Sequence, residues 1–494
     1  MKFSTLIRNL KKKLFGKDAK KPDIQPIQRS PAAKDSVPAI SDLISAPSAI
    51  RQAYLIQIGF DFGSSYSKCV CRDIMTNKAW VHLPYKCERQ ELPFLNPSAL
   101  LLKNRRIGPV EDHRCHYPEN GLLYLKHALV KIALCQWDDP VLNPYRSAVG
   151  SPDLDKLCGF VETCAVYFLA GAFGEVRAQI RRRLPEFGSL PEDYMAVNLA
   201  VPVADAERAE VNTLYHRILC EAWGLADKLA GHPPIHLSEL ESLRKEPHED
   251  WVQSMGESCF IYPEVSANVQ GFVRSRISGP GIYLFSDSGA STVDQSIFIF
   301  MRRSKGEYLT YLHGSVLPLG SSLIEQKAAI NSGKMNWQSL ETWREIKEQG
   351  GTAPELRKAR EWIAQRLSQG TEATLAFARQ KLFDKDQIND TRVIFGGGGH
   401  CEYPYKAAVM KPFSGQLFRK SIAPDVVGLP LPLDLGLKDS ETRWMRRLSV
   451  AYGLSFEKSE LAGFTYPKDV TTPKPEEIWQ QRKKIPDPPS KDQC

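Results

Sequence analysis

The sequence lacks the usual features of a secreted protein, a membrane-spanning protein or a protein with a cysteine-based metal site. Its eleven cysteines are scattered along 494 residues, and no two have the Cys-x-x-Cys spacing of zinc or redox sites. No segment approaches eighteen uninterrupted apolar residues, so we expect no membrane-spanning helix. We also find no signal peptide, and unpatterned cysteines are typical of a reducing compartment. These absences predict a soluble, cytoplasmic protein.

The body of the chain carries almost no net charge. The formal net charge is +8, but residues 1–21 hold eight Lys or Arg against one Asp and so account for +7 of it. The remaining chain is nearly neutral, which argues against a broad nucleic-acid-binding face. We therefore expect no nucleic acid among the partners.

The basic start has the pattern of an amphipathic helix. Residues 1–17 place five large apolar side chains on one helical face: Phe3, Leu6, Ile7, Leu10 and Leu14. Such a helix could lie peripherally on the anionic inner face of a membrane or dock on a protein partner. A solvated basic leader and an organelle-targeting segment are the alternatives. Residues 18–52, rich in Pro, Ser and Ala, predict a linker to the body.

Two segments far apart in the chain share one pattern. In residues 55–73 and in residues 281–300, an apolar β-rich run ends in an Asp-x-Gly-small-small turn and continues into a second such run. Each segment therefore predicts a hairpin with an acidic residue, Asp61 or Asp287, at its turn. Small residues let backbone N–H groups converge on phosphate oxygens, and the two carboxylates can hold the waters of a Mg²⁺ ion.

The turn residues complete the predicted phosphate site. We assign phosphate binding to residues of both turns, which are Gly63, Ser64, Ser65 and Tyr66 in the first and Gly289, Ala290, Ser291 and Thr292 in the second.

A third segment has the composition of a loop that passes close to a flat ligand. Residues 392–400 form a short apolar run followed by Gly396, Gly397, Gly398, Gly399 and His400. Because glycine lets the backbone approach a ligand closely, we expect this loop to lie against a flat ligand such as adenine. A flexible surface loop is the alternative, which a preceding buried strand makes a poorer explanation.

With these three segments the chain resembles the superfamily of actin, hexokinase-type sugar kinases and the seventy-kilodalton heat-shock chaperones, and is most similar to the chaperones. Residues 59–67 (GFDFGSSYS) resemble their first phosphate hairpin. Residues 287–294 (DSGASTVD) resemble the Asp-x-Gly-Gly-Gly-Thr-x-Asp of their second. Weaker similarities follow in the same order along the chain, in residues 195–208, 263–271, 317–326 and 447–456. The whole resemblance covers about residues 54–456.

The resemblance implies a fold and catalytic residues. The fold is α/β and two-lobed, with duplicated ribonuclease H-like domains in residues 53–270 and 271–456. Lys126 is similar to the catalytic lysine of the chaperones, and Lys68 to the phosphate-contacting lysine of actin; a solvated strand lysine is the alternative for Lys68. The catalytic set implied is Asp61, Lys126, Glu264, Asp287 and Asp294, with ATP or ADP and Mg²⁺ as cofactors.

Departures from the family pattern qualify these expectations. Ala290 and Ser291 replace two glycines of the second turn, which adds atoms beside the phosphates and predicts slow hydrolysis. Residues 338–385 predict two or three charged helices without strands, and so a reduced lid subdomain. Residues 457–494 contain six prolines and predict a disordered tail in place of a peptide-binding domain.

Three classes of function remain open. The first is a chaperone-like nucleotide switch that binds and slowly hydrolyses ATP and is read by an unidentified protein partner. The second is an actin-like filament or scaffold at a membrane, which Lys68 and the amphipathic start favour. The third is a small-molecule kinase, although we find no recognisable sugar-binding segment.

Overall fold

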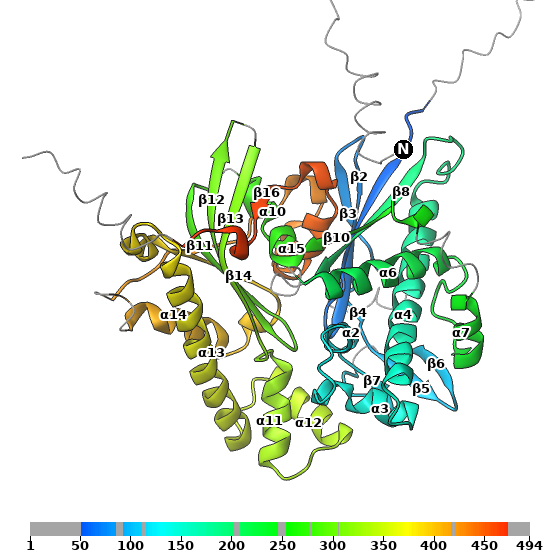
Figure 1. Cartoon of the computed structure of the whole chain (residues 1–494), viewed down its shortest axis with the longest axis horizontal. Coiled ribbons are helices and arrows are strands. Elements are labelled where there is room, and N and C mark those ends of the chain that lie inside the picture. Colours follow the sequence, from blue (N-terminus) through cyan, green and yellow to red (C-terminus); the bar gives the residue numbers. More distant parts are fainter. Residues whose placement is uncertain are drawn as a thin grey trace, which may run out of the picture.

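The computed structural model describes residues 51–84, 92–110, 115–201, 208–245, 253–275, 278–304, 306–415, 418 and 421–472 (Figure 1). The predicted basic helix 1–17, most of the linker 18–52 and the end of the predicted tail lie outside these residues. The described chain is a mixed α/β protein built around two large sheets and one small sheet.

The first large sheet has the strand order β10-β8-β1-β2-β3. Its strands are β1 (Leu55–Asp61), β2 (Tyr66–Asp73), β3 (Lys78–Val81), β8 (Tyr194–Val201) and β10 (Cys259–Pro263), and the short β4 (Asn96–Pro97) also pairs with β2. The first three strands are antiparallel neighbours, whereas β8 and β10 run parallel to β1. All seven residues of β1 are buried because helices cover both faces of the sheet.

The second large sheet repeats this order, with one strand added at an edge. It reads β15-β14-β11-β12-β13-β16. Its strands are β11 (Gly281–Ser288), β12 (Val293–Arg303), β13 (Gly306–Leu317), β14 (Arg392–Gly396), β15 (Val426–Val427) and β16 (Gly463–Thr465). Strands β11, β12 and β13 form an antiparallel meander, while β14 and β15 lie parallel to β11. Both predicted hairpins, β1–β2 and β11–β12, are therefore confirmed.

Helices cover the sheets on both faces. The core of the first half packs α2 (Leu125–Ala133), α4 (Leu154–Arg183) and α6 (Ala209–Leu225) against its sheet. The core of the second half packs α11 (Ser322–Asn331), α13 (Pro354–Gln380) and α14 (Tyr405–Met410) against the other. The remaining helices are α3 (Asn143–Val149), α7 (Leu237–Lys245), α9 (Glu264–Asn268), α10 (Gln270–Val273) and α12 (Trp337–Glu348).

Helix α15 (Met445–Leu454) lies between the two halves (Figure 1). It contacts β1 and β2 of the first sheet and β14 of the second, and also α9. The approach is close: a Cβ atom added to Gly59 of β1 would lie 2.1 Å from the Ala451 carbonyl oxygen, and one added to Gly453 would lie 1.8 Å from that of Ala267. Two glycines thus let one helix pack tightly against β1 and α9.

A small antiparallel sheet extends the first half, and a helical region between β13 and β14 extends the second. The small sheet has the order β7-β5-β6-β9, made by β5 (Leu100–Lys103), β6 (Arg106–Pro109), β7 (Gly121–Leu122) and β9 (Ile235–His236). Between β13 and β14, residues 322–380 form α11, α12 and α13, and no strand occurs in the described residues 318–391. The prediction of helices without a strand pair between residues 338 and 385 is confirmed.

One expectation needs correction. The tail was expected to be disordered from residue 457, but β16 pairs in parallel with β13, because Phe464 packs into the core beside Tyr262 and Tyr311. Helix α4 is long and apolar enough to cross a membrane by length and composition, which counting uninterrupted apolar residues did not reveal. In the structure, 83% of its most apolar window is buried inside the protein.

Candidate functional site

A cavity of about 340 Å³ lies where the two hairpin turns meet. Its wall is built by the turns after β1 and β11, the starts of α2 and α9, the glycine loop after β14, helices α11 and α12, and the start of α15. Residues separated by almost four hundred positions therefore share one space. Most of the residues that the sequence assigned to a nucleotide are in this wall.

The predicted residues in the wall come from five segments. They are Asp61, Gly63, Ser64, Ser65, Tyr66 and Lys68; Lys126; Glu264; Asp287, Gly289, Ala290, Thr292 and Asp294; and Gly397, Gly398 and Gly399. Three predicted residues are not part of the wall. The Ser291 carbonyl accepts the N–H of Gly320, Gly396 ends the buried strand β14, and the His400 ring bonds back to the Gly396 carbonyl.

The first turn joins a carboxylate to a lysine. Asp61 ends β1, and its carbonyl accepts the N–H of Gly63 at 3.0 Å, which closes the turn. Lys68 lies opposite Asp61 in the β1–β2 ladder, and its Nζ lies 2.5 Å from Asp61 Oδ2. Lys68 is therefore not a solvated strand lysine, because its side chain is only 15% exposed and points into the cavity wall.

The second turn is tied to the segment that follows β13. Asp287 and Asp294 face each other across the β11–β12 ladder. The carbonyl groups of Gly289 and Ala290 accept the N–H groups of residues 321 and 322. A Cβ atom added to Gly320 would lie 2.2 Å from the Ala290 carbonyl oxygen, so only glycine fits beneath this turn. These contacts fix the turn and orient Ala290 toward the cavity.

A second lysine–carboxylate pair lies deeper in the cavity. Lys126, in the first turn of α2, places its Nζ 2.6 Å from Oε2 of Glu264, the first residue of α9. Burial alone lowers the pKa of Lys126, but the nearby carboxylates of Glu264 and Asp61 raise it overall above its ordinary value. Lys126 is therefore a fixed positive charge at physiological pH.

The cavity gathers carboxylates that repel one another. Burial, followed by the charge of Glu264, raises the pKa of Asp287 to about 7. Burial and Glu264 also raise the pKa of Asp294 above its usual range. Burial raises the pKa of Asp61, although the neighbouring charge of Lys68 opposes the rise. Such a cluster is costly without a cation, so the chemistry of these groups fits a divalent ion and its waters.

Buried polar atoms without a partner mark the same region. Among the described residues, the Ser288 hydroxyl, the Ser291 hydroxyl and Asp294 Oδ1 are buried without a hydrogen-bond partner. Unpaired buried polar atoms are rare and call for a ligand, an ion or ordered water. The described residues contain no group of three His, Cys, Asp or Glu side chains close enough to bind a metal directly.

The glycine loop packs directly on the second turn. Gly397 has a φ of +75°, and a Cβ atom there would lie 2.2 Å from Asp287 Oδ1. A Cβ atom on Gly398 would lie 2.8 Å from Cζ of Arg447, in the first turn of α15. The loop is thus wedged between Asp287 and Arg447, which rules out the alternative of a flexible surface loop.

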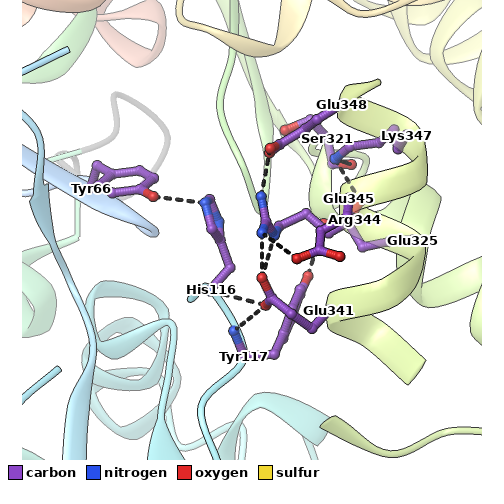
Figure 2. A network of polar contacts seen from close by, with 10 residues as sticks. All are labelled: Tyr66, His116, Tyr117, Ser321, Glu325, Glu341, Arg344, Glu345, Lys347 and Glu348. Carbon is purple, nitrogen blue, oxygen red and sulfur yellow. Dashed lines mark hydrogen bonds and ion pairs between the residues drawn. The ribbon is translucent and has the colours of Figure 1, made fainter. Parts of the chain in front are cut away.

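Sequence reasoning missed the side of the cavity made by α11 and α12 (Figure 2). Arg344 and Lys347 of α12 are both buried, and Lys347 Nζ lies 2.7 Å from Oε2 of Glu325 on α11. Arg344 NH1 lies 2.5 Å from Oε2 of Glu348. The sequence signal was only a charged helix, which is typical of a solvated face.

The same helices contact the first half of the molecule (Figure 2). Glu341 Oε2 accepts the backbone N–H groups of His116 and Tyr117, each at 3.0 Å. The Tyr117 hydroxyl donates to Glu325 at 2.9 Å, and the Tyr66 hydroxyl lies 2.7 Å from His116 Nε2. These bonds close one side of the cavity by joining α11 and α12 to the loop before β7.

Glu341 offers a test of this closure. We expect Glu341→Ala to speed hydrogen exchange at the amides of His116 and Tyr117 by about tenfold, because a hydrogen bond to a charged group contributes about 1.5 kcal/mol or more. Amide exchange followed by mass spectrometry measures this directly. Glu345→Ala is the matched control, since Glu345 is 58% exposed and 3.9 Å from Arg344. Equal exchange in both variants would contradict the contact.

Comparison with known proteins adds no family assignment. No protein-family model and no curated protein matches this chain.

Proposed function

We propose that this cavity binds ATP or ADP together with Mg²⁺, and that the chain is a slowly hydrolysing, chaperone-like nucleotide switch. The observation that carries the proposal is the meeting of both Asp-x-Gly-small-small turns, the glycine loop, Lys68 and Lys126 in one cavity. The repeated strand order of the two large sheets supports a two-lobed actin-like ATPase fold. In that fold, helices α11 to α13 are the reduced lid.

The residues of the cavity have complementary roles in this proposal. Asp61 and Asp287 would hold the waters of Mg²⁺, which when bound neutralises charge on the phosphates. The two turns and Lys68 would hold the phosphates, while Gly397, Gly398 and Gly399 would lie against the adenosine. Lys126, held by Glu264, would position the terminal phosphate and the attacking water by charge alone.

Asp294 is suited to orienting that water. One of its oxygens, Oδ2, accepts from the Thr292 hydroxyl at 3.1 Å, and the other has no partner among the described residues. A carboxylate with one oxygen held and the other unpaired can accept a hydrogen bond from a water molecule and so orient it. Glu264 is less free to do this, because its Oε2 is paired with Lys126.

Ala290 is expected to slow hydrolysis. It lines the cavity where the resembled family has glycine, whereas Ser291 does not. We therefore expect Ala290→Gly to raise the rate of phosphate release several-fold and Ser291→Gly, the matched control, to leave it unchanged. A colorimetric phosphate assay on both variants measures this. If the two glycine variants behave alike, the Ala290 methyl group does not crowd the phosphates.

The proposal is tested by measuring binding and turnover separately. Calorimetric titration of the full chain with ATP should give one site that needs Mg²⁺, and phosphate release from the complex should be slow. Failure to bind ATP or ADP with Mg²⁺ would contradict the proposal. Nucleotide-dependent pelleting that rises with protein concentration would instead favour the filament, which Lys68 in the cavity also fits.

A further inference from the structure

A thiol lies at the rim of this cavity, directly after the glycine loop. Cys401 ends the short 3₁₀ helix η4 (Gly399–Cys401), and its side chain is exposed. Of the free cysteines in the described residues, Cys401 alone lines the cavity. It therefore combines access from solvent with a place beside the proposed adenosine loop.

The neighbouring histidine presents a base to this thiol. Cys401 Sγ lies 3.8 Å from Nε2 of His400, and His400 Nδ1 lies 2.8 Å from the carbonyl oxygen of Gly396. A carbonyl oxygen only accepts, so Nδ1 carries the proton and the neutral ring leaves a lone pair on Nε2. The ring is 8% exposed and stacked on Phe395, which holds it in this orientation.

A cation lies on the other side of the sulfur. Arg446 NH1 is 3.8 Å from Cys401 Sγ, and a guanidinium at that distance stabilises a thiolate. The hydrogen bond between the Cys401 thiol and His400 and, to a smaller extent, the nearby Arg446 lower the pKa of that thiol to about 7, although burial opposes this shift. Exposure together with such a positive environment distinguishes reactive cysteines from inert ones.

The space beside the thiol is suited to a polar ligand. The Ser288 hydroxyl is buried without a partner among the described residues and lines the cavity. A Cβ atom on Gly399 would lie only 2.8 Å from the Ser288 carbonyl oxygen, so the turn that carries Cys401 rests on the strand end that carries Asp287. A covalent modification of Cys401 would therefore lie in the wall of the cavity.

We propose that Cys401 is a modification site at which hydroperoxides oxidise the chain. The sulfur attacks one peroxide oxygen, an S–O bond forms as the O–O bond breaks, and the sulfur loses two electrons to the peroxide. His400 takes the thiol proton and returns it to the leaving oxygen, which departs as water from hydrogen peroxide. The product is a sulfenic acid on Cys401. Any link between this oxidation and nucleotide binding rests on the proposed function.

The test compares two exposed cysteines of the full chain. Hydrogen peroxide is added at pH 7, sulfenic acids are trapped with dimedone, and the labelled peptides are quantified by mass spectrometry. Cys135, exposed and outside the cavity wall, is the internal control. We expect Cys401 to be labelled about threefold faster or more. At pH 7 a thiol of pKa about 7 is half ionised, whereas a thiol of the ordinary pKa of 8.5 is about 3% ionised. The less basic thiolate is a weaker nucleophile, which offsets part of the advantage in thiolate fraction.

Two further measurements test the proposal: labelling of an Arg446 variant, and labelling in the presence of ATP and Mg²⁺. Arg446→Gln should slow the labelling of Cys401 and leave that of Cys135 unchanged, whereas equal labelling of both cysteines in the original chain would overturn the proposal. Fast labelling that ATP and Mg²⁺ slow at Cys401 alone supports both the thiol and the nucleotide site. Fast labelling that nucleotide leaves unchanged supports the thiol and counts against the proposed function.

Discussion

Replacing Asp287 by Asn is expected to stabilise the empty protein and to abolish its stabilisation by Mg²⁺ and ATP. The pKa of Asp287 is raised to about 7 in the folded chain, against about 3.9 for an unfolded aspartate. Its contribution to stability is therefore full below about pH 4 and is lost as the pH rises through 7. At pH 8 the folded chain holds an unfavourable buried carboxylate, which Asn removes.

The size of this effect follows from the pH window. Between pH 5 and pH 8, Asp287→Asn should gain about 2 kcal/mol relative to the original chain, since one pKa unit corresponds to about 1.4 kcal/mol. Thermal unfolding at both pH values, with and without Mg²⁺ and ATP, measures both effects.

Asp61→Asn should also lose the stabilisation by nucleotide. Asp227→Asn is the control, because Asp227 pairs with Arg177 and Arg181 outside the cavity. Unchanged nucleotide stabilisation in Asp61→Asn and Asp287→Asn would rule out the assignment.

Replacing Lys126 by Met is expected to cost both stability and turnover. The change leaves Glu264, whose side chain is 13% exposed, near other carboxylates without its cation, and breaking such a pair costs up to about 3–5 kcal/mol when the pair is fully buried. Phosphate release should fall more than tenfold, because preorganised charge at the reacting phosphate is lost. Lys131→Met is the matched control: Lys131 lies on the same helix and pairs with Asp139 outside the cavity.

A double variant separates the two effects of Lys126. Adding Glu264→Gln to Lys126→Met removes the unpaired carboxylate and should restore most of the lost stability, whereas turnover should stay low. Unfolding by denaturant and phosphate release are measured on the same preparations. Recovery of turnover along with stability would show that Lys126 supports only the fold.

The parts predictable from sequence were those with a local signal. Asp61 and Asp287 each end an apolar run before a turn of small residues, and that pattern fixes a hairpin whatever surrounds it. The glycine loop could also be predicted from the sequence, because a buried strand precedes it. These segments placed the two predicted turns and their carboxylates within one cavity.

The parts that sequence could not predict depend on contacts between distant elements. Arg344 and Lys347 read as a solvated helix face, and only the packing of α12 on α11 buries them at the cavity. Phe464 lies in a proline-rich segment, yet it joins the aromatic core beside β13. His400 was assigned to the ligand, but its hydrogen bond to Gly396 turns the ring away and toward Cys401.

The most direct test of the central claim is a structure of the full chain with ADP and Mg²⁺. The account predicts phosphates between the turn of residues 63–66 and the turn of residues 289–292. It also predicts Mg²⁺ waters on Asp61 and Asp287, and adenosine against Gly397 and Gly398. Nucleotide bound elsewhere, or a cavity that stays empty at saturating nucleotide, would contradict it.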